Sequence, residues 1–118
     1  MLIDITSLYN TTIKNRNLKH FDIWCGPGNV LQTILDTYVF YDIPYDMRAI
    51  DLSAQMVDQC NERFSTDDNI QVTQANIFDL DPTNYEQQDI VTCNLMSHNI
   101  PVDKKSAFLE KLYSLLAP

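Results

Sequence analysis

Both glycines of this 118-residue chain lie in one short turn, in the segment WCGPGN at 24–29. The turn follows a compact apolar run, HFDIWC, of the kind that forms a buried strand. After the turn, apolar residues recur at helical spacing, at Val30, Leu31, Ile34, Leu35 and Tyr38. A strand, a glycine turn and a helix in this order predict the first unit of a parallel α/β sheet, because parallel strands need a crossover connection.

Strand-like and helix-like segments continue to alternate after this unit. Three more segments have the character of strands, at 47–51 (MRAID), 70–77 (IQVTQANI) and 89–96 (DIVTCNLM). Helical spacing predicts one helix that buries Met56, Val57, Cys60 and Phe64, and a last helix with Phe108, Leu109, Leu112, Leu115 and Leu116. Ser53 and Asp103 are the expected N-caps of these two helices.

The remaining segments complete the expected order of elements. A short amphipathic helix is expected at about 4–14, a turn at 42–46 (DIPYD) and a polar loop at 79–88. The order is therefore α, then β-α-β-α-β-loop-β-α. It predicts an open α/β sheet of parallel strands, and the length fits a single domain over 1–118.

The charge and the cysteines narrow the class of protein. A formal net charge of −8 argues against a protein that grips nucleic-acid phosphates by itself. The three cysteines form no CxxC pair and the two histidines have no ligand-like spacing, so we expect free thiols and no metal site. The amino-terminal segment lacks the basic start and the long apolar run of a signal peptide or a membrane span. We therefore expect a cytoplasmic protein without membrane contact.

The glycine turn has the position of a ligand site. In an open parallel sheet, ligands bind at the carboxyl ends of the strands, where the strand order reverses. Gly26 and Gly28 let the backbone approach a ligand closely, and Asp51 ends the next strand, about 23 residues after Gly28. A carboxylate there can accept hydrogen bonds from both hydroxyls of a ribose. The combination predicts a site for a nucleoside-bearing cofactor.

Three residues argue against a dinucleotide as that cofactor. The dinucleotide fingerprint needs a small residue three positions after the second glycine, and here Leu31 occupies that position while Pro27 separates the glycines. Asp22, inside the strand before the turn, suits a cationic ammonium group better than a pyrophosphate, which it would repel. A nicotinamide-dependent oxidoreductase is therefore disfavoured and kept as an alternative.

Several segments resemble the motifs of the class I S-adenosylmethionine (SAM)-dependent methyltransferases, in the order in which that family has them. FDIWCGPGN at 21–29 resembles motif I, AIDLSAQMV at 49–57 motif II, and DIVTCNLMSHNIP at 89–101 motif IV. QANIFDLD at 74–81 lies where the family has its adenine loop, and LEKLYSLLAP at 109–118 is similar to the helix after strand 4. The resemblance implies a Rossmann-like open parallel sheet with strand order 3-2-1-4 and helices on both faces, without the late strands of the family.

The resemblance also implies SAM as the cofactor and a set of residues around it. Asp22 would organise the turn and the methionine end, Asp51 would hold the ribose hydroxyls and Leu52 would flank the adenine. Asn76 would accept the adenine amino proton, and Asn94 would line the transfer site. The full expected set is Asp22, Trp24, Cys25, Gly26, Gly28, Asp51, Leu52, Met56, Asn76, Ile77, Asn94 and Leu95.

The expected reaction is transfer of a methyl group from SAM to an unidentified acceptor. The acidity favours a small-molecule or protein acceptor over nucleic acid. His98 is either a general base near the acceptor, since its ordinary pKa lies near neutrality, or a structural or solvent-facing residue. The alternative function is a degenerate methyltransferase-like module that binds or assembles without catalysis.

Two features depart from the family pattern. Trp24 stands where the family has its first glycine, so its indole either points into the core beneath the following helix or enters the cofactor pocket. The strand at 89–96 is apolar on both faces and would be left as a bare edge. Truncation is the preferred explanation, and a homodimer across this edge or strands supplied by another chain are the alternatives.

Overall fold

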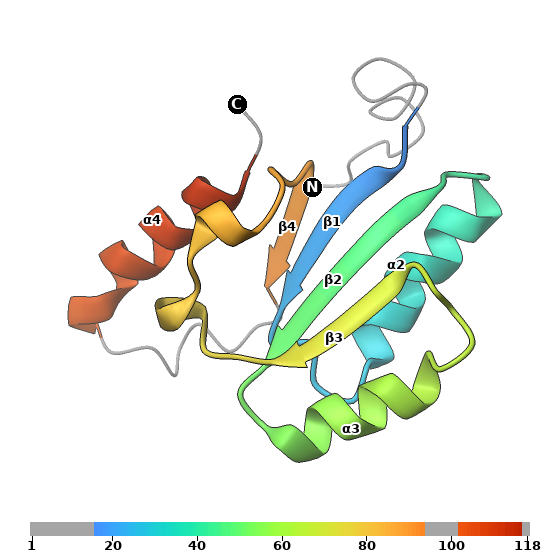
Figure 1. The fold of residues 1–118 in the computed structure, drawn as a ribbon, viewed down its shortest axis with the longest axis horizontal. Coiled ribbons are helices and arrows are strands. Elements are labelled where there is room, and N and C mark those ends of the chain that lie inside the picture. Colours follow the sequence, from blue (N-terminus) through green and yellow to red (C-terminus); the bar gives the residue numbers. More distant parts are fainter. Residues whose placement is uncertain (1–15, 94–101, 117–118) are drawn as a thin grey trace.

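The computed structural model describes residues 16–93 and 102–116 of the chain. The expected helix at 4–14 lies outside the described residues. Strands and helices alternate as the sequence predicts (Figure 1): β1 (Leu18–Ile23), α2 (Asn29–Phe40), β2 (Tyr45–Asp51), α3 (Ala54–Arg63), β3 (Ile70–Gln74), β4 (Ile90–Cys93) and α4 (Lys105–Leu115).

The strands form one parallel sheet in the order β3-β2-β1-β4, which confirms the predicted fold class. Figure 1 shows β3 at one edge and β4 at the other. β1 pairs with β2 from Leu18 and Tyr45 to Ile23 and Ile50, and on its other side with β4. Because the strand order reverses between β1 and β4, the topological switch point lies at the carboxyl end of β1, where the glycine turn begins.

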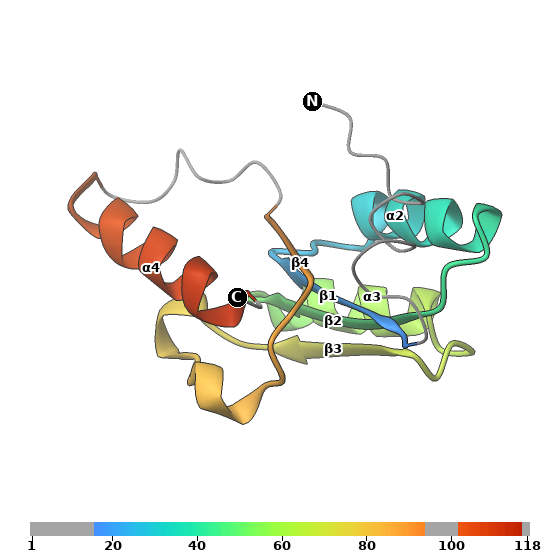
Figure 2. The ribbon, with the colours of Figure 1, turned by 90° about the horizontal axis from the view of Figure 1, so that it is seen from above.

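Helices cover both faces of the sheet. On one face α2 and α3 pack on the strands through the first core cluster, which contains Leu18, Cys25, Leu31, Leu35, Tyr38, Ile43, Met47, Ala49, Cys60 and Phe64. On the opposite face α4 and the 79–88 loop region close the second core cluster, which contains Phe21, Ile23, Ile50, Ile77, Leu80, Phe108 and Leu115. In Figure 2, α2 lies on one side of the strands and the gold 3-10 turns of the loop lie on the other.

Several strand boundaries differ from the sequence prediction. β1 spans Leu18–Ile23, two residues earlier in the chain than the predicted run at 20–25. β2 begins at Tyr45, inside the segment predicted as a turn, because the N–H of Leu18 bonds to the carbonyl of Pro44 and the pairing continues at once. β3 ends at Gln74 rather than at 77, because Asn76 caps a 3-10 turn at Ile77–Asp79. The polar loop also contains a second 3-10 turn, Pro82–Asn84.

The predicted helix caps have different outcomes. Ser53 caps α3 as predicted, since its side chain accepts a hydrogen bond from the N–H of Met56 at 3.3 Å. Asp103 is not the cap of α4: it lies in a 3-10 turn, Val102–Lys104, and Lys104 precedes the helix without a side-chain bond. The prediction failed because an acidic residue before an apolar run does not reveal an intervening turn.

The strand β4 lies at the sheet edge, as the resemblance predicts. Just before β4, the backbone at this edge is already paired with the segment after α4. Gln88 and Leu116 form a parallel bridge in which the N–H of Gln88 bonds to the carbonyl of Leu115 at 2.7 Å. The chain thus returns to the sheet beside β4 after α4. A homodimer across this edge stays a prediction.

Candidate functional site

The backbone of the turn between β1 and α2 has three residues in the left-handed region. Their φ angles are 61° at Trp24, 57° at Gly26 and 99° at Gly28. Glycine adopts this region without steric cost, whereas a bulky side chain is strained there. The backbone therefore explains why the chain has its two glycines here, and Trp24 takes up a conformation that suits glycine.

The two glycines are needed for different reasons. A Cβ atom added to Gly28 would lie 2.9 Å from Cε2 of Phe64 and 3.2 Å from Sγ of Cys60, so Gly28 lets α2 begin tightly against α3. A Cβ atom added to Gly26 would meet no atom within 4 Å. Gly26 thus borders open space at the carboxyl end of the sheet, which leaves room for a ligand close to the backbone.

Asp51 joins the turn to the start of α3. One carboxylate oxygen accepts the N–H of Gly26 and the other accepts the N–H of Ser53, both at 2.9 Å. The backbone pairing continues past the strand, since the N–H of Cys25 bonds to the carbonyl of Ile50 at 3.0 Å. The carboxylate is therefore held at the strand end, beside the open side of Gly26.

Asp22 is a buried carboxylate on the β1 side of the same site. Its side chain is 2% exposed and accepts a hydrogen bond from the hydroxyl of Thr92 on β4 at 2.8 Å. Burial raises the pKa of Asp22 to about 6, the bond from Thr92 lowers it, and the nearby charge of Asp51 raises it further. Two acidic groups at adjacent strand ends make this an anionic site.

A hydrogen-bonded chain of side chains behind Asp22 was not predicted from the sequence. Nε2 of His20 lies 2.8 Å from the Thr92 hydroxyl, and Nδ1 of His20 bonds to the hydroxyl of Tyr38 on α2. Burial lowers the pKa of His20 to about 4, so the imidazole is neutral near pH 7. The signal in the sequence was one uncharged polar residue in each of two strands, His20 and Thr92, which spacing alone did not connect.

Trp24 points to the face of the sheet opposite α2. Its indole stacks on Phe108 of α4, with ring centroids 5.3 Å apart and planes at 11°, and packs on the second core cluster. Of the two alternatives for the indole, the one that places it in the core beneath the following helix is therefore wrong. The cause is the left-handed backbone at Trp24, which turns the side chain toward α4.

The other expected cofactor residues differ in how available their side chains are. Leu52 is 53% exposed directly after Asp51, and Met56 is half-buried in the first turn of α3. The Asn76 side-chain oxygen accepts the N–H of Phe78 at 3.0 Å, and Ile77 is 1% exposed within the second core cluster. Leu52 thus offers an apolar surface beside Asp51, whereas Ile77 contributes mainly to packing.

Cys25 is buried inside the turn, 2% exposed. The contact with Cys60 of α3 and then burial raise the pKa of the Cys25 thiol, so it stays protonated near pH 7. Its side chain packs in the first core cluster. The structure therefore places the Cys25 side chain in the core, and only its backbone belongs to the turn surface.

Three expected site residues, Asn94, Leu95 and His98, lie outside the described residues. Within 16–93 and 102–116, no three His, Cys, Asp or Glu side chains gather closely enough to hold a metal ion. Over the same residues, none of the helices has the length and apolar character needed to cross a membrane.

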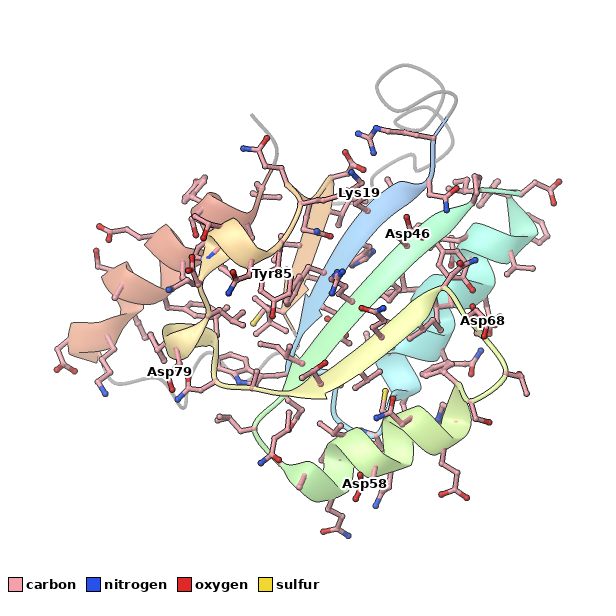
Figure 3. The ribbon with its side chains drawn as sticks, viewed as in Figure 1. Lys19, Asp46, Asp58, Asp68, Asp79 and Tyr85 are labelled. Atoms are coloured by element: carbon pink, nitrogen blue, oxygen red, sulfur yellow. The ribbon has the colours of Figure 1, made fainter. Side chains whose placement is uncertain are left out.

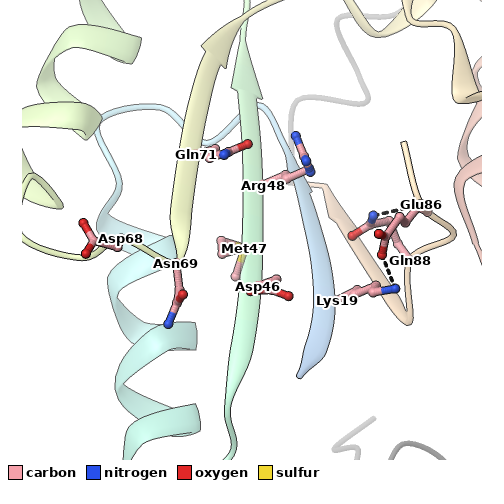
Figure 4. A pocket seen from close by; sticks show the side chains of 9 residues that line it. All are labelled: Lys19, Asp46, Met47, Arg48, Asp68, Asn69, Gln71, Glu86 and Gln88. Carbon is pink, nitrogen blue, oxygen red and sulfur yellow. Dashed lines mark hydrogen bonds and ion pairs between the residues drawn. The ribbon is translucent and has the colours of Figure 1, made fainter. Parts of the chain in front are cut away.

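A polar cleft lies at the opposite end of the sheet, near the amino ends of the strands (Figure 4). It has a volume of about 160 Å³ and includes Lys19, Arg48 and Glu86, with an ion pair between Lys19 and Glu86. Arg48 also lies over the ring of Tyr85, 5.4 Å from its centroid. The cleft is separate from the glycine turn, so it is not the predicted ligand site.

The parallel sheet with strand order β3-β2-β1-β4 and helices on both faces defines a Rossmann-like domain. A family profile described as "Methyltransferase domain" matches residues 21–118. The chain belongs to this methyltransferase family. No curated protein sequence matches the chain.

Solved structures of similar fold agree with this assignment. The CMeT domain of the citrinin polyketide synthase has a TM-score of 0.75 and 18% identity, with 87% of this chain and 27% of that chain covered. PKMT2 from Rickettsia typhi has a TM-score of 0.73 and 26% identity, with 86% and 19% covered. Phosphoethanolamine N-methyltransferase 2 from Haemonchus contortus, with bound S-adenosylhomocysteine, has a TM-score of 0.69 and 16% identity, with 94% and 25% covered. The chain thus spans between 19% and 27% of the length of these proteins.

Proposed function

We propose that this chain binds SAM at the carboxyl ends of β1 and β2 and acts as a SAM-dependent methyltransferase. The observation that carries the proposal is the pairing of Gly26 with Asp51. The N–H of Gly26 donates to the Asp51 carboxylate, and the Cα of Gly26 borders open space. A nucleoside can approach the backbone at such a point while the acid takes its ribose.

The chemistry of Asp51 fits a ribose. Each carboxylate oxygen has two lone-pair sites, and each accepts one backbone N–H in the structure. One acceptor site on each oxygen is thus left for the two ribose hydroxyls. The exposed side chain of Leu52, next along the chain, is suited to pack against the adenine ring.

The charge of the site fits the other end of the cofactor. Asp22 and Asp51 lie at adjacent strand ends, and Asp51 acts electrostatically on Asp22. Carboxylates of this kind attract the ammonium and sulfonium charges of SAM and repel a pyrophosphate. The neighbour from Haemonchus contortus, with its S-adenosylhomocysteine, supports the same choice of cofactor.

The contribution of the protein to catalysis is positioning. When bound, SAM supplies a methyl group on a sulfonium that is already electrophilic. The turn and Asp51 would hold the nucleoside end of SAM, and Asp22 would hold its methionine end, which would fix the orientation of the cofactor relative to an acceptor. We propose a small molecule or a protein as the acceptor.

Calorimetric titration of the chain tests the cofactor. We expect micromolar binding of SAM and S-adenosylhomocysteine and none of NAD. Asp51→Asn should weaken binding of S-adenosylhomocysteine by about tenfold or more, because hydrogen bonds to a charged acceptor are lost. Asp58→Asn is the matched control, since Asp58 is an exposed acid on the outer side of α3 (Figure 3) and should leave binding unchanged.

The other outcomes each identify a rival. Binding of NAD alone would favour the oxidoreductase. Absence of binding in a folded protein, checked by circular dichroism, would favour the assembly module without catalysis. Equal affinity in wild type and Asp51→Asn would contradict the role of Asp51 even if SAM binds.

A further inference from the structure

The side chains of Tyr38, His20, Thr92 and Asp22 form one continuous hydrogen-bonded chain on the face of the sheet that α2 covers. It runs from α2 to β1, crosses to β4 and returns to β1 at the cofactor end. Tyr38, His20 and Asp22 are at most 2% exposed. A buried chain of this kind is stable only if each polar atom finds a partner, so its proton positions are constrained.

The donors and acceptors of the chain have one consistent assignment when Asp22 is ionised. A carboxylate only accepts, so the single hydroxyl proton of Thr92 goes to Asp22. Thr92 must then accept from Nε2–H of His20, and Nδ1 must accept from Tyr38. Burial raises the pKa of Tyr38, so its hydroxyl keeps the proton that it donates. All three bonds therefore point toward the carboxylate.

We propose that Tyr38, His20 and Thr92 are positioning residues that keep Asp22 ionised and oriented at the cofactor end of β1. Aligned donors reinforce one another and stabilise the negative charge at the end of the chain. The role of Asp22 toward the cofactor rests on the proposed function. The hydrogen-bonded network of Tyr38, His20, Thr92 and Asp22 does not depend on that function, and it can be tested in the protein without cofactor.

The surroundings of Asp22 explain why such a chain is needed. From β2 the charge of Asp51 opposes ionisation, and burial opposes it more strongly. The thiols of Cys25, Cys60 and Cys93 also lie within electrostatic range of Asp22, and each is acted on by its charge. Among the described groups that shift the pKa of Asp22, the Thr92 hydroxyl alone lowers it. Tyr38 and His20 thus support the hydrogen bond from Thr92, which is the contact that favours ionised Asp22.

Carboxyl and imidazole NMR signals of the free protein test the chain directly. At pH 8, long-range proton–nitrogen spectra should show His20 protonated on Nε2. In a carbon-detected titration, Thr92→Val should raise the pKa of Asp22 by about one unit or more, because one hydrogen bond to a charged group is lost. Thr92→Ser keeps the hydroxyl and should restore the wild-type pKa. Tyr38→Phe removes only the remote donor and should cause a smaller rise.

Two results would overturn the proposal: protonation of His20 on Nδ1 at pH 8, or an unchanged Asp22 pKa in both Thr92→Val and Tyr38→Phe. If Thr92→Val does not fold, Tyr38→Phe and the wild-type tautomer still decide. A second experiment measures S-adenosylhomocysteine affinity at pH 6 and pH 8. The affinity of wild type and of Thr92→Ser should rise little from pH 6 to pH 8, whereas the affinity of Thr92→Val should rise severalfold. No binding by any variant would contradict the proposed function and leave the NMR result standing.

Discussion

The two faces of β1 are both buried, yet they are stabilised in different ways. Toward α4, Phe21 and Ile23 pack in the second core cluster, and Phe21 meets Tyr85 edge to face with ring centroids 5.3 Å apart. Toward α2, His20 and Asp22 are as buried as Phe21, but they belong to the hydrogen-bonded chain. Residues 20–23 thus alternate between an apolar core on one side and, on the other, a polar network that adjoins the first core cluster at Tyr38.

This difference suggests that the two faces of β1 serve different ends, one the stability of the fold and the other the ligand site. Apolar packing tolerates changes of pH and contributes in proportion to buried area. A buried polar network contributes little net stability and is costly when broken, so its presence indicates a role in placing a charged group. The side chains that face α4 therefore stabilise the position of the strand, and those that face α2 orient the Asp22 carboxylate and keep it ionised.

The largest expected effect is on the apolar face. Phe21→Ala should lower the free energy of unfolding by about 3–5 kcal/mol, because it removes a fully buried ring and leaves a cavity. Urea denaturation followed by circular dichroism measures it. Lys19→Met is the control on the same face of β1 at its open end, and it should leave the denaturation midpoint unchanged. A similar loss of unfolding free energy in Phe21→Ala and Lys19→Met would show that the buried ring does not account for the effect.

The polar face should respond to pH in two opposing ways. The pKa of His20 is about 4, below its ordinary 6.5, so the unfolded chain binds more protons there and stability falls as pH drops from 6.5 to 4. The pKa of Asp22 is about 6, above its ordinary 3.8, so the folded chain binds more protons and stability falls as pH rises from 3.8 to 6. The two effects, each about 2–3 kcal/mol, nearly cancel between pH 4 and 6.

Single variants should separate these effects. Relative to wild type, Asp22→Asn should gain stability as pH rises from 4 to 6, whereas His20→Gln should lose it. Denaturation midpoints at pH 4, 5 and 6 measure the slopes, and the other titrating groups are common to all three proteins. Parallel pH profiles would show that neither group is perturbed by its burial.

The smallest expected effects concern the two glycines. Gly28→Ala should cost about 2 kcal/mol or more, because the added methyl group meets Phe64 and Cys60 of the core and the backbone is left-handed. Gly26→Ala should cost only about 1 kcal/mol, since it has the same backbone strain and open space around it. Thermal denaturation compares them, and equal costs would show that Gly26 also packs against the core.

Much of the architecture followed from local pattern. The alternation of apolar runs and helical spacing predicted each described strand and each of the helices α2, α3 and α4, and Ser53 was the correct cap of α3. Boundaries were less accurate, as at Tyr45 and at the end of β3, because strand ends depend on pairing partners that a sequence does not display. The turn Val102–Lys104 before α4 was missed for a related reason.

At the site, the glycine turn, Asp22 and Asp51 were identified in the sequence by residue type and spacing. The chain through Tyr38, His20 and Thr92 was not, since its members lie 18 and 72 residues apart and meet only across the sheet. The direction of Trp24 was left open between two alternatives, because a left-handed backbone angle at a tryptophan has no signature in the sequence.

The amino-acid sequence by itself determined the order of strands and helices along the chain, the place of the turn and the positions of its acids. These are local properties of periodicity, glycine and charge. The tertiary structure alone decided that Trp24 stacks on Phe108, and that His20 and Thr92 join Asp22 in one buried network. The physical reason is that such contacts depend on the register of strands far apart in the chain, which is set by the packing of the whole sheet.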